Sequence, residues 1–236
     1  MSKSPMSIDE CLEALQRERY REISERCLGA SDYEVLSRLQ ARLTLGECSA
    51  HEVLRTLLGM ATPWTLGTRV AESALHLGVE ACIAMRSKAQ AQAWIEVCRG
   101  KEGIREVACT LAEVEVMLAF DERESAEERL SEIEDSNETM LLRANYAYIK
   151  GDFSAALELL EPLTQRETFG HLQRKALRLA AQASAAERKF SEEAEFLERI
   201  LKELPEGVRS EGERLELATA YAAQGGAESL SKAEEQ

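Results

Sequence analysis

Apolar side chains recur every three or four residues through most of this 236-residue chain, and short polar breaks separate the runs. Such spacing places apolar groups on one face of a helix, so it predicts amphipathic helices and almost no β-structure. Capping boxes, in which a serine precedes a glutamate by three residues, mark three helix starts: Ser7 and Glu10, Ser31 and Glu34, and Ser49 and Glu52. The pattern predicts an all-α fold of about six helical pairs joined by short turns.

The stretch from Ser136 to Leu204 contains two helical hairpins in the same register, 37 residues apart. The shift pairs residues of similar kind: Ala144 with Ala181, Phe153 with Phe190, Leu159 with Phe196, Leu160 with Leu197, and Leu163 with Ile200. A second shift of equal length leads to Ala218 and Gly225, which correspond to Ala144 and Gly151. A fixed period in the thirties is typical of solenoids of helical pairs, in which each pair buries its apolar face against the next.

The segment from Tyr148 to Leu160 reads Tyr-Ile-Lys-Gly-Asp-Phe-Ser-Ala-Ala-Leu-Glu-Leu-Leu. It resembles the tetratricopeptide repeat (TPR) family, in which an aromatic residue precedes a Gly-Asp-Tyr/Phe turn and an alanine follows three residues later. In the next unit, Arg188 stands at the position of the turn glycine and Glu193 at that of the alanine. The resemblance implies a right-handed superhelical solenoid of antiparallel helix pairs, whose first helices line a concave groove that binds a partner protein.

We expect residues 1–6 to form a disordered tail, as chain ends commonly do. Residues 7–236 are expected to form a single α-helical repeat domain, because no long linker or low-complexity segment divides them. Within this domain, we interpret residues 7–135 as divergent helical pairs and residues 136–236 as the clearer TPR-like units. Pro162 falls inside an expected helix and should either end it a turn early or kink it.

The chain carries 29 basic and 43 acidic residues, and its net charge of −14 disfavours nucleic-acid binding over most of the surface. Residues 165–189 are the exception, with six basic side chains against two acidic ones. Arg174, Lys175 and Arg178 lie there beside apolar positions of one expected helix. These cations form either a solvated face or a groove segment that meets an acidic or helical partner. Asn145 and Tyr148, from the preceding unit, are further candidates for the groove.

Sequence motifs for catalysis are missing. The sequence has no phosphate-binding loop, dinucleotide fingerprint, nucleophile elbow or His-Glu-x-x-His motif, so we expect no enzymatic activity, cofactor or metal. Its six cysteines have no Cys-x-x-Cys spacing, which predicts buried free thiols and a reducing compartment. No apolar run is long enough to cross a bilayer and no signal peptide is visible, so we expect a cytoplasmic protein that does not bind membranes.

These patterns favour a non-catalytic protein–protein interaction module. The leading hypothesis is a TPR-like adaptor or chaperone that holds a peptide or helix of a partner protein in its groove. Two alternatives stay open: a peptide- or ligand-sensing regulatory protein that acts through another protein, and a structural subunit of a larger assembly. Neither the identity of the partner nor the oligomeric state follows from the pattern.

Overall fold

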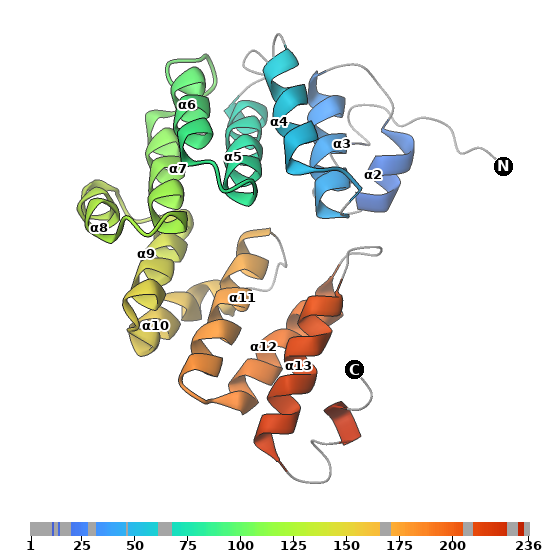
Figure 1. Cartoon of the computed structure of the whole chain (residues 1–236), viewed down its shortest axis with the longest axis vertical. Helices are drawn as coiled ribbons and strands as arrows, with labels where there is room; N and C mark the ends of the chain where they lie inside the picture. The colour runs from blue at the N-terminus through green and yellow to red at the C-terminus, as the bar shows by residue number, and fades with distance from the viewer. Residues whose placement is uncertain are drawn as a thin grey trace, which may run out of the picture. The chain divides into compact units, whose positions relative to one another are not determined.

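The structure is a computed structural model that describes residues 11, 14, 20–27, 32–45, 47–60, 68–165, 171–204, 210–225 and 231–233. The regular elements within these ranges are all helices, which confirms the predicted all-α class (Figure 1). The expected tail at residues 1–6 and the capping boxes that begin at Ser7 and Ser31 lie outside the described residues.

Short links join most of the successive helices (Figure 1). The helices are α2 (Tyr20–Arg26), α3 (Asp32–Thr44), α4 (Ala50–Gly59), α5 (Thr68–Ala84), α6 (Lys88–Cys98), α7 (Glu106–Ala119), α8 (Arg123–Glu132), α9 (Asn137–Lys150), α10 (Phe153–Thr164), α11 (His171–Ala186), α12 (Phe190–Glu203) and α13 (Glu211–Gln224). The cap predicted at Ser49 is confirmed, since its hydroxyl accepts a hydrogen bond from the Glu52 N–H at 3.2 Å. Ser87 precedes α6, but its side chain makes no capping bond.

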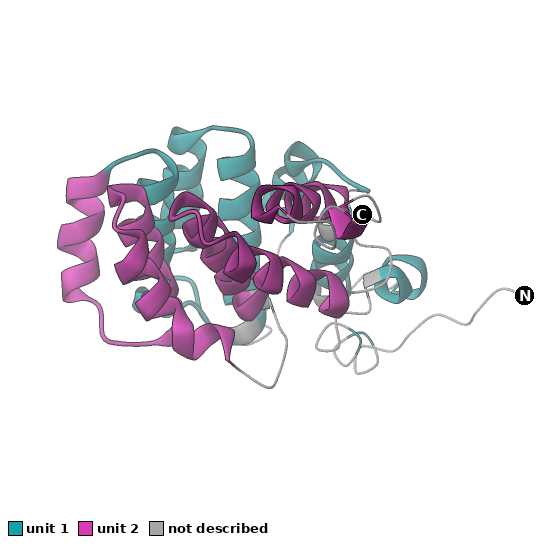
Figure 2. Ribbon diagram, turned by 90° about the horizontal axis from the view of Figure 1, so that it is seen from below, with its two compact units in different colours: residues 1–122, 205–208 teal, residues 123–204, 209–236 magenta. Residues whose placement is uncertain are grey.

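Contacts within the chain define two compact units, of which the first ends at Glu122 and the second begins at Arg123 (Figure 2). Unit 1 contains α2 to α7, and unit 2 contains α8 to α13. The boundary lies close to residue 135, where the sequence predicts a change from divergent pairs to clearer repeats. The single repeat domain expected from the sequence stays a prediction.

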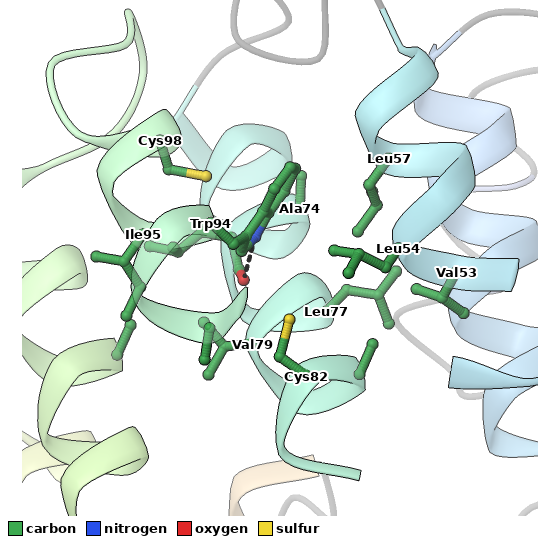
Figure 3. Packing of buried hydrophobic residues seen from close by; sticks show 14 of the residues in the cluster. Val53, Leu54, Leu57, Ala74, Leu77, Val79, Cys82, Trp94, Ile95 and Cys98 are labelled. Atoms are coloured by element: carbon green, nitrogen blue, oxygen red, sulfur yellow. Dashed lines mark hydrogen bonds between the residues drawn. The ribbon is translucent and has the colours of Figure 1, made fainter. Parts of the chain in front are cut away.

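Helix α5 is the centre of unit 1, because it packs against α3, α4, α6 and α7. The Trp94 indole of α6 lies directly against α5, and its Nε1 donates a hydrogen bond to the Leu75 carbonyl at 3.1 Å (Figure 3). Only glycine fits at position 78, since an added Cβ would lie 2.5 Å from Cε2 of that ring. The absence of a side chain at Gly78 therefore lets α6 approach α5 closely.

A second, smaller core in unit 1 differs from the sequence prediction. This N-terminal cluster consists of Cys11, Ala14, Ile23, Cys27, Ala41 and Leu45, with Val70 packed against it. Cys11 and Cys27 form a disulfide, with their Cα atoms 6.0 Å apart. The prediction that every cysteine is a free thiol is wrong for this pair, because pairing across 16 residues leaves no local spacing pattern. The cysteine argument for a reducing compartment is lost with it.

In unit 2, helices α9 to α13 each pack against the next one in sequence, α8 packs against α9, and α11 also packs against α9. One apolar cluster joins α9, α10 and α11, and a second joins α11, α12 and α13. Leu160 and Leu163 are buried in the first, and their counterparts at the 37-residue shift, Leu197 and Ile200, are buried in the second. The burial of both members of each pair agrees with the predicted repeat.

The same left-handed turn ends four helices of the chain. Its residues with positive φ are Arg86 (55°), Asp121 (62°), Gly151 (85°) and Arg188 (62°), which follow α5, α7, α9 and α11. In each turn the next N–H donates to the carbonyl five residues back, as Asp152 does to Ala147 at 2.9 Å and Lys189 to Ser184 at 2.8 Å. The turns lie 30 to 37 residues apart. The turn geometry thus recurs in the front half of the chain, although the amino-acid sequence there shows little repetition.

Positive φ angles also recur with the 37-residue period in unit 2. Gly151, Arg188 and Gly225 lie one period apart, and all three have positive φ. A left-handed conformation is about 1–2 kcal/mol less favourable for an L-residue, so the conformation of Arg188 lowers the stability of the fold.

Pro162 does not end its helix a turn early, because α10 continues past it to Thr164.

Candidate functional site

The candidate groove residues lie on α9 and α11, which pack against each other in unit 2. One side of α9 packs against α8, where the Arg143 guanidinium donates to the Leu130 carbonyl at 3.3 Å and pairs with the Asp135 carboxylate that follows α8. Another side packs on α10, where the Tyr148 and Phe153 ring centroids are 5.4 Å apart. Tyr148 is therefore half-buried as a packing residue between two helices.

A third side of α9 carries Leu142, Asn145 and Ile149, which are all half-buried. Their spacing of three and four residues places them in one line along the helix. Asn145, the second candidate from this helix, thus lies between two partly exposed apolar side chains. Its amide offers both a donor and an acceptor, the groups that bind the backbone of an extended peptide.

Helix α11 is buried on most of its surface. Between Leu172 and Ser184, the side chains that keep some exposure are those of Leu172, Arg174, Lys175, Arg178 and Gln182. Three of these five are the predicted cations, so the basic residues occupy a narrow stripe on a helix that is otherwise core. The predicted placement of Arg174, Lys175 and Arg178 beside apolar positions is confirmed.

Arg178 has an ion-pair partner on another helix of unit 2. Its guanidinium forms an ion pair with the Glu213 carboxylate of α13. Glu213 is buried, whereas Arg178 is half exposed. A buried carboxylate needs such a partner, because desolvation without one is costly. Arg178 therefore holds α13 against α11, and its charge is partly neutralised within the chain.

Further carboxylates surround α13. Burial raises the pKa of the Glu193 carboxyl of α12, and the nearby Glu216 carboxylate raises it further. The Tyr221 hydroxyl donates to the Glu198 carboxylate across the same pair of helices. The α12 and α13 contact is thus rich in acidic groups, which would repel an acidic partner segment.

A set of hydrogen bonds at the C-terminus of α10 could not be predicted from the sequence. The Thr164 carbonyl, left without an intrahelical partner at the helix end, accepts hydrogen bonds from Gln173 of α11 at 3.2 Å and Arg199 of α12 at 2.5 Å. This one oxygen ties three successive helices together. Side chains that bind a distant backbone carbonyl have no characteristic spacing, so no sequence signal marks them.

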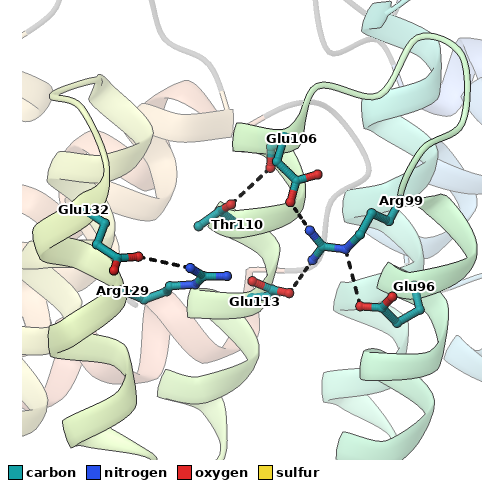
Figure 4. Close-up of polar contacts among 7 residues, drawn as sticks. All are labelled: Glu96, Arg99, Glu106, Thr110, Glu113, Arg129 and Glu132. Atoms are coloured by element: carbon teal, nitrogen blue, oxygen red, sulfur yellow. Dashed lines mark hydrogen bonds and ion pairs between the residues drawn. The ribbon is translucent and has the colours of Figure 1, made fainter.

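Unit 1 holds a second group of charges, around Arg99 (Figure 4). Its guanidinium pairs with Glu96 of α6 at 3.4 Å and with Glu106 and Glu113 of α7. The bidentate pair of Arg105 with Glu72, at 2.7 and 2.8 Å, similarly joins α7 to α5. Since these cations are held by carboxylates of neighbouring helices, they stabilise helix packing.

Potential metal ligands and core thiols are scattered or buried among the described residues. Among them, no group of three His, Cys, Asp or Glu side chains is arranged to hold a metal ion. The free thiols Cys82, Cys98 and Cys109 are buried. Burial raises the pKa of Cys98 to about 12, which keeps it in the unreactive thiol form. No helix in the described ranges combines the length and apolar character needed to cross a membrane.

Comparisons with known proteins add no functional assignment. No family model, curated protein or solved structure matches this chain. The likeness to TPR units therefore stays an expectation from the residues between Tyr148 and Leu160. The function must be argued from α9 and α11.

Proposed function

We propose that this protein is a non-catalytic binding module, a TPR-like adaptor or chaperone that holds a peptide or helix of a partner protein on α9 and α11. The observation that carries the proposal is the narrow stripe on α11, where cations are most of what a largely buried helix leaves accessible. The right-handed solenoid of antiparallel pairs belongs to the same proposal. Successive packing of α9 to α13 supports it, since such packing is typical of helical repeats.

The chemistry of the stripe favours an acidic partner segment. Arg174 and Lys175 present positive charge on a chain whose net charge is −14, so an acidic partner would be repelled by most of the surface and attracted at this stripe. Leu142 and Ile149 supply partly exposed apolar surface on the neighbouring α9, and Asn145 lies between them. An extended or helical segment with acidic and apolar side chains would match these groups. Charge would then determine partner choice and association rate more than affinity.

A charge-reversal pair tests the proposal. A partner is first isolated with the full chain by affinity capture and mass spectrometry, and its binding is then measured by calorimetry. Lys175→Glu on α11 is compared with Lys202→Glu, a matched change at an exposed lysine of α12. We expect Lys175→Glu to weaken binding about tenfold or more, which is ~1.4 kcal/mol, and the control to change it little. Equal affinities for both variants, with helical circular dichroism unchanged, would refute the proposal.

The salt dependence of binding provides a second measurement. If the stripe meets acidic side chains, the affinity of the partner for the wild-type protein should fall with rising ionic strength, and this dependence should be weaker for Lys175→Glu.

A cytoplasmic location, expected from the sequence, is part of the same proposal. Cell fractionation with an antibody to the chain tests it directly.

A further inference from the structure

The disulfide between Cys11 and Cys27 has no role in the proposed binding surface. It closes a segment of 16 residues and lies in the N-terminal cluster, where both cysteines are fully buried. The remaining cysteines, Cys48, Cys82, Cys98 and Cys109, are free. Of the six cysteines, two form a disulfide and four do not.

The N-terminal cluster is small, and the disulfide makes up two of its six buried residues. Polar ties also hold α2 in place: the Arg38 guanidinium donates to the Cys27 carbonyl at 2.9 Å, and the Ser24 hydroxyl donates to the Glu47 carboxylate at 2.6 Å. Both ties are at least partly accessible to water, so each contributes modestly. A cross-link stabilises by removing conformational entropy from the unfolded segment. The docking of α2 in this cluster thus depends strongly on the sulfur–sulfur bond.

Cys11 and Cys27 are as buried as Cys82, Cys98 and Cys109, so the difference between the two groups is the core to which each belongs. Disulfide formation requires a thiolate, and burial raises the pKa of Cys82, of Cys98 and of Cys109. These three cysteines belong to the main core of unit 1. Cys11 and Cys27 instead belong to a minor cluster, which opens more readily by local unfolding.

We propose that Cys11 and Cys27 form a redox latch for α2. In the oxidised state, the disulfide ties Cys11 to the end of α2, which packs against α3. Two thiols of a low-molecular-weight or protein reductant reduce it: the S–S bond breaks, both sulfurs take up an electron and a proton, and the reductant leaves as its own disulfide. Release of α2 then uncovers Ala41 on α3, Leu45 just after α3 and Val70 on α5. Disulfides in reducing compartments are usually transient and redox-sensing, which is the behaviour proposed here.

Counting thiols tests whether the bond forms. The full chain is purified without reductant, treated with oxidised glutathione, denatured and alkylated before and after reduction. We expect four labelled cysteines before reduction and six after it, with a cross-linked peptide joining Cys11 to Cys27. Labelling of all six cysteines before reduction, or a cross-link between other residues, would overturn the latch.

Limited trypsin digestion tests whether the bond controls docking. Cleavage after the exposed Arg21 of α2 should become about a hundredfold faster on reduction, in line with the loop-closure entropy of a segment of this length. Without reductant, Cys11→Ser should be cleaved as fast as the wild type whose disulfide has been reduced. Cys48→Ser, a matched change at a free cysteine, should respond to reductant like the wild type. Equal cleavage rates of the oxidised and reduced wild type would overturn the proposal, and this comparison needs no variant. The outcome is independent of partner binding at α11.

Discussion

Replacing Gly78 with alanine tests the packing at the centre of unit 1. In an isolated helix this change stabilises by about 1 kcal/mol. Here the new methyl group would lie 2.5 Å from Cε2 of Trp94, a separation that folded proteins do not tolerate. The indole must move, which adds about 1–3 kcal/mol of overpacking and loses about 1 kcal/mol from its hydrogen bond to Leu75. The expected result is a net destabilisation of about 2 kcal/mol.

Urea denaturation monitored by tryptophan fluorescence measures this change in unit 1, because both tryptophans of the chain precede Glu122. Gly59→Ala is the matched control, since no heavy atom lies within 4 Å of a Cβ at that position of α4. The control should be as stable as the wild type or more so. If Gly78→Ala behaved like Gly59→Ala, the argument that Trp94 excludes a side chain from position 78 would be wrong.

A double-mutant cycle isolates the cause. Trp94→Phe shortens the ring system and gives the alanine at position 78 more room, so Gly78→Ala should cost clearly less in that background than in the wild type. Far-UV circular dichroism replaces fluorescence for these variants. Additive effects of the two changes would show that the destabilisation arises elsewhere.

Three further predictions concern unit 2. Arg188→Gly should stabilise it by about 1 kcal/mol in chemical denaturation, because glycine adopts positive φ without the steric penalty of arginine. Arg178→Gln should destabilise it by about 1 kcal/mol by leaving the buried Glu213 carboxylate unpaired, and the double variant with Glu213→Gln should recover most of that loss. Glu193, whose pKa is raised in the folded state, makes the wild type less stable as the pH rises above 4.5. Glu193→Gln should therefore be more stable at neutral pH, a difference that thermal denaturation should no longer detect below pH 4.5.

The helices and the repeat were predictable because they depend on local spacing. The shift of 37 residues identified Leu160 with Leu197 and Leu163 with Ile200, and both pairs are buried. The turn at Arg188 was harder to recognise, since arginine is disfavoured at positive φ. Hydrogen bonds and packing around that turn outweigh the local preference, and single-residue propensity does not include them.

The exposure of the basic residues on α11 was predictable, whereas their partners within the chain were not. The basic positions of α11 followed from helical spacing, and they do lie on its accessible stripe. The partner of Arg178 did not follow, because Glu213 is 35 residues away and only packing of α13 against its neighbours brings the two charges together. The same reason applies to the disulfide of Cys11 with Cys27 and to the bonds that converge on the Thr164 carbonyl.

The recurring left-handed turn gives unit 2 a modular construction that protein engineering could use. Residues 152–188 begin just after the turn residue Gly151 and end with the turn residue Arg188. A tandem duplication of this segment would join two ends that already have the same backbone geometry, and it would place Leu160 and Leu163 where Leu197 and Ile200 now pack. The chain could thus be lengthened by one helical pair, and with it the surface that α9 and α11 present, without designing a new junction.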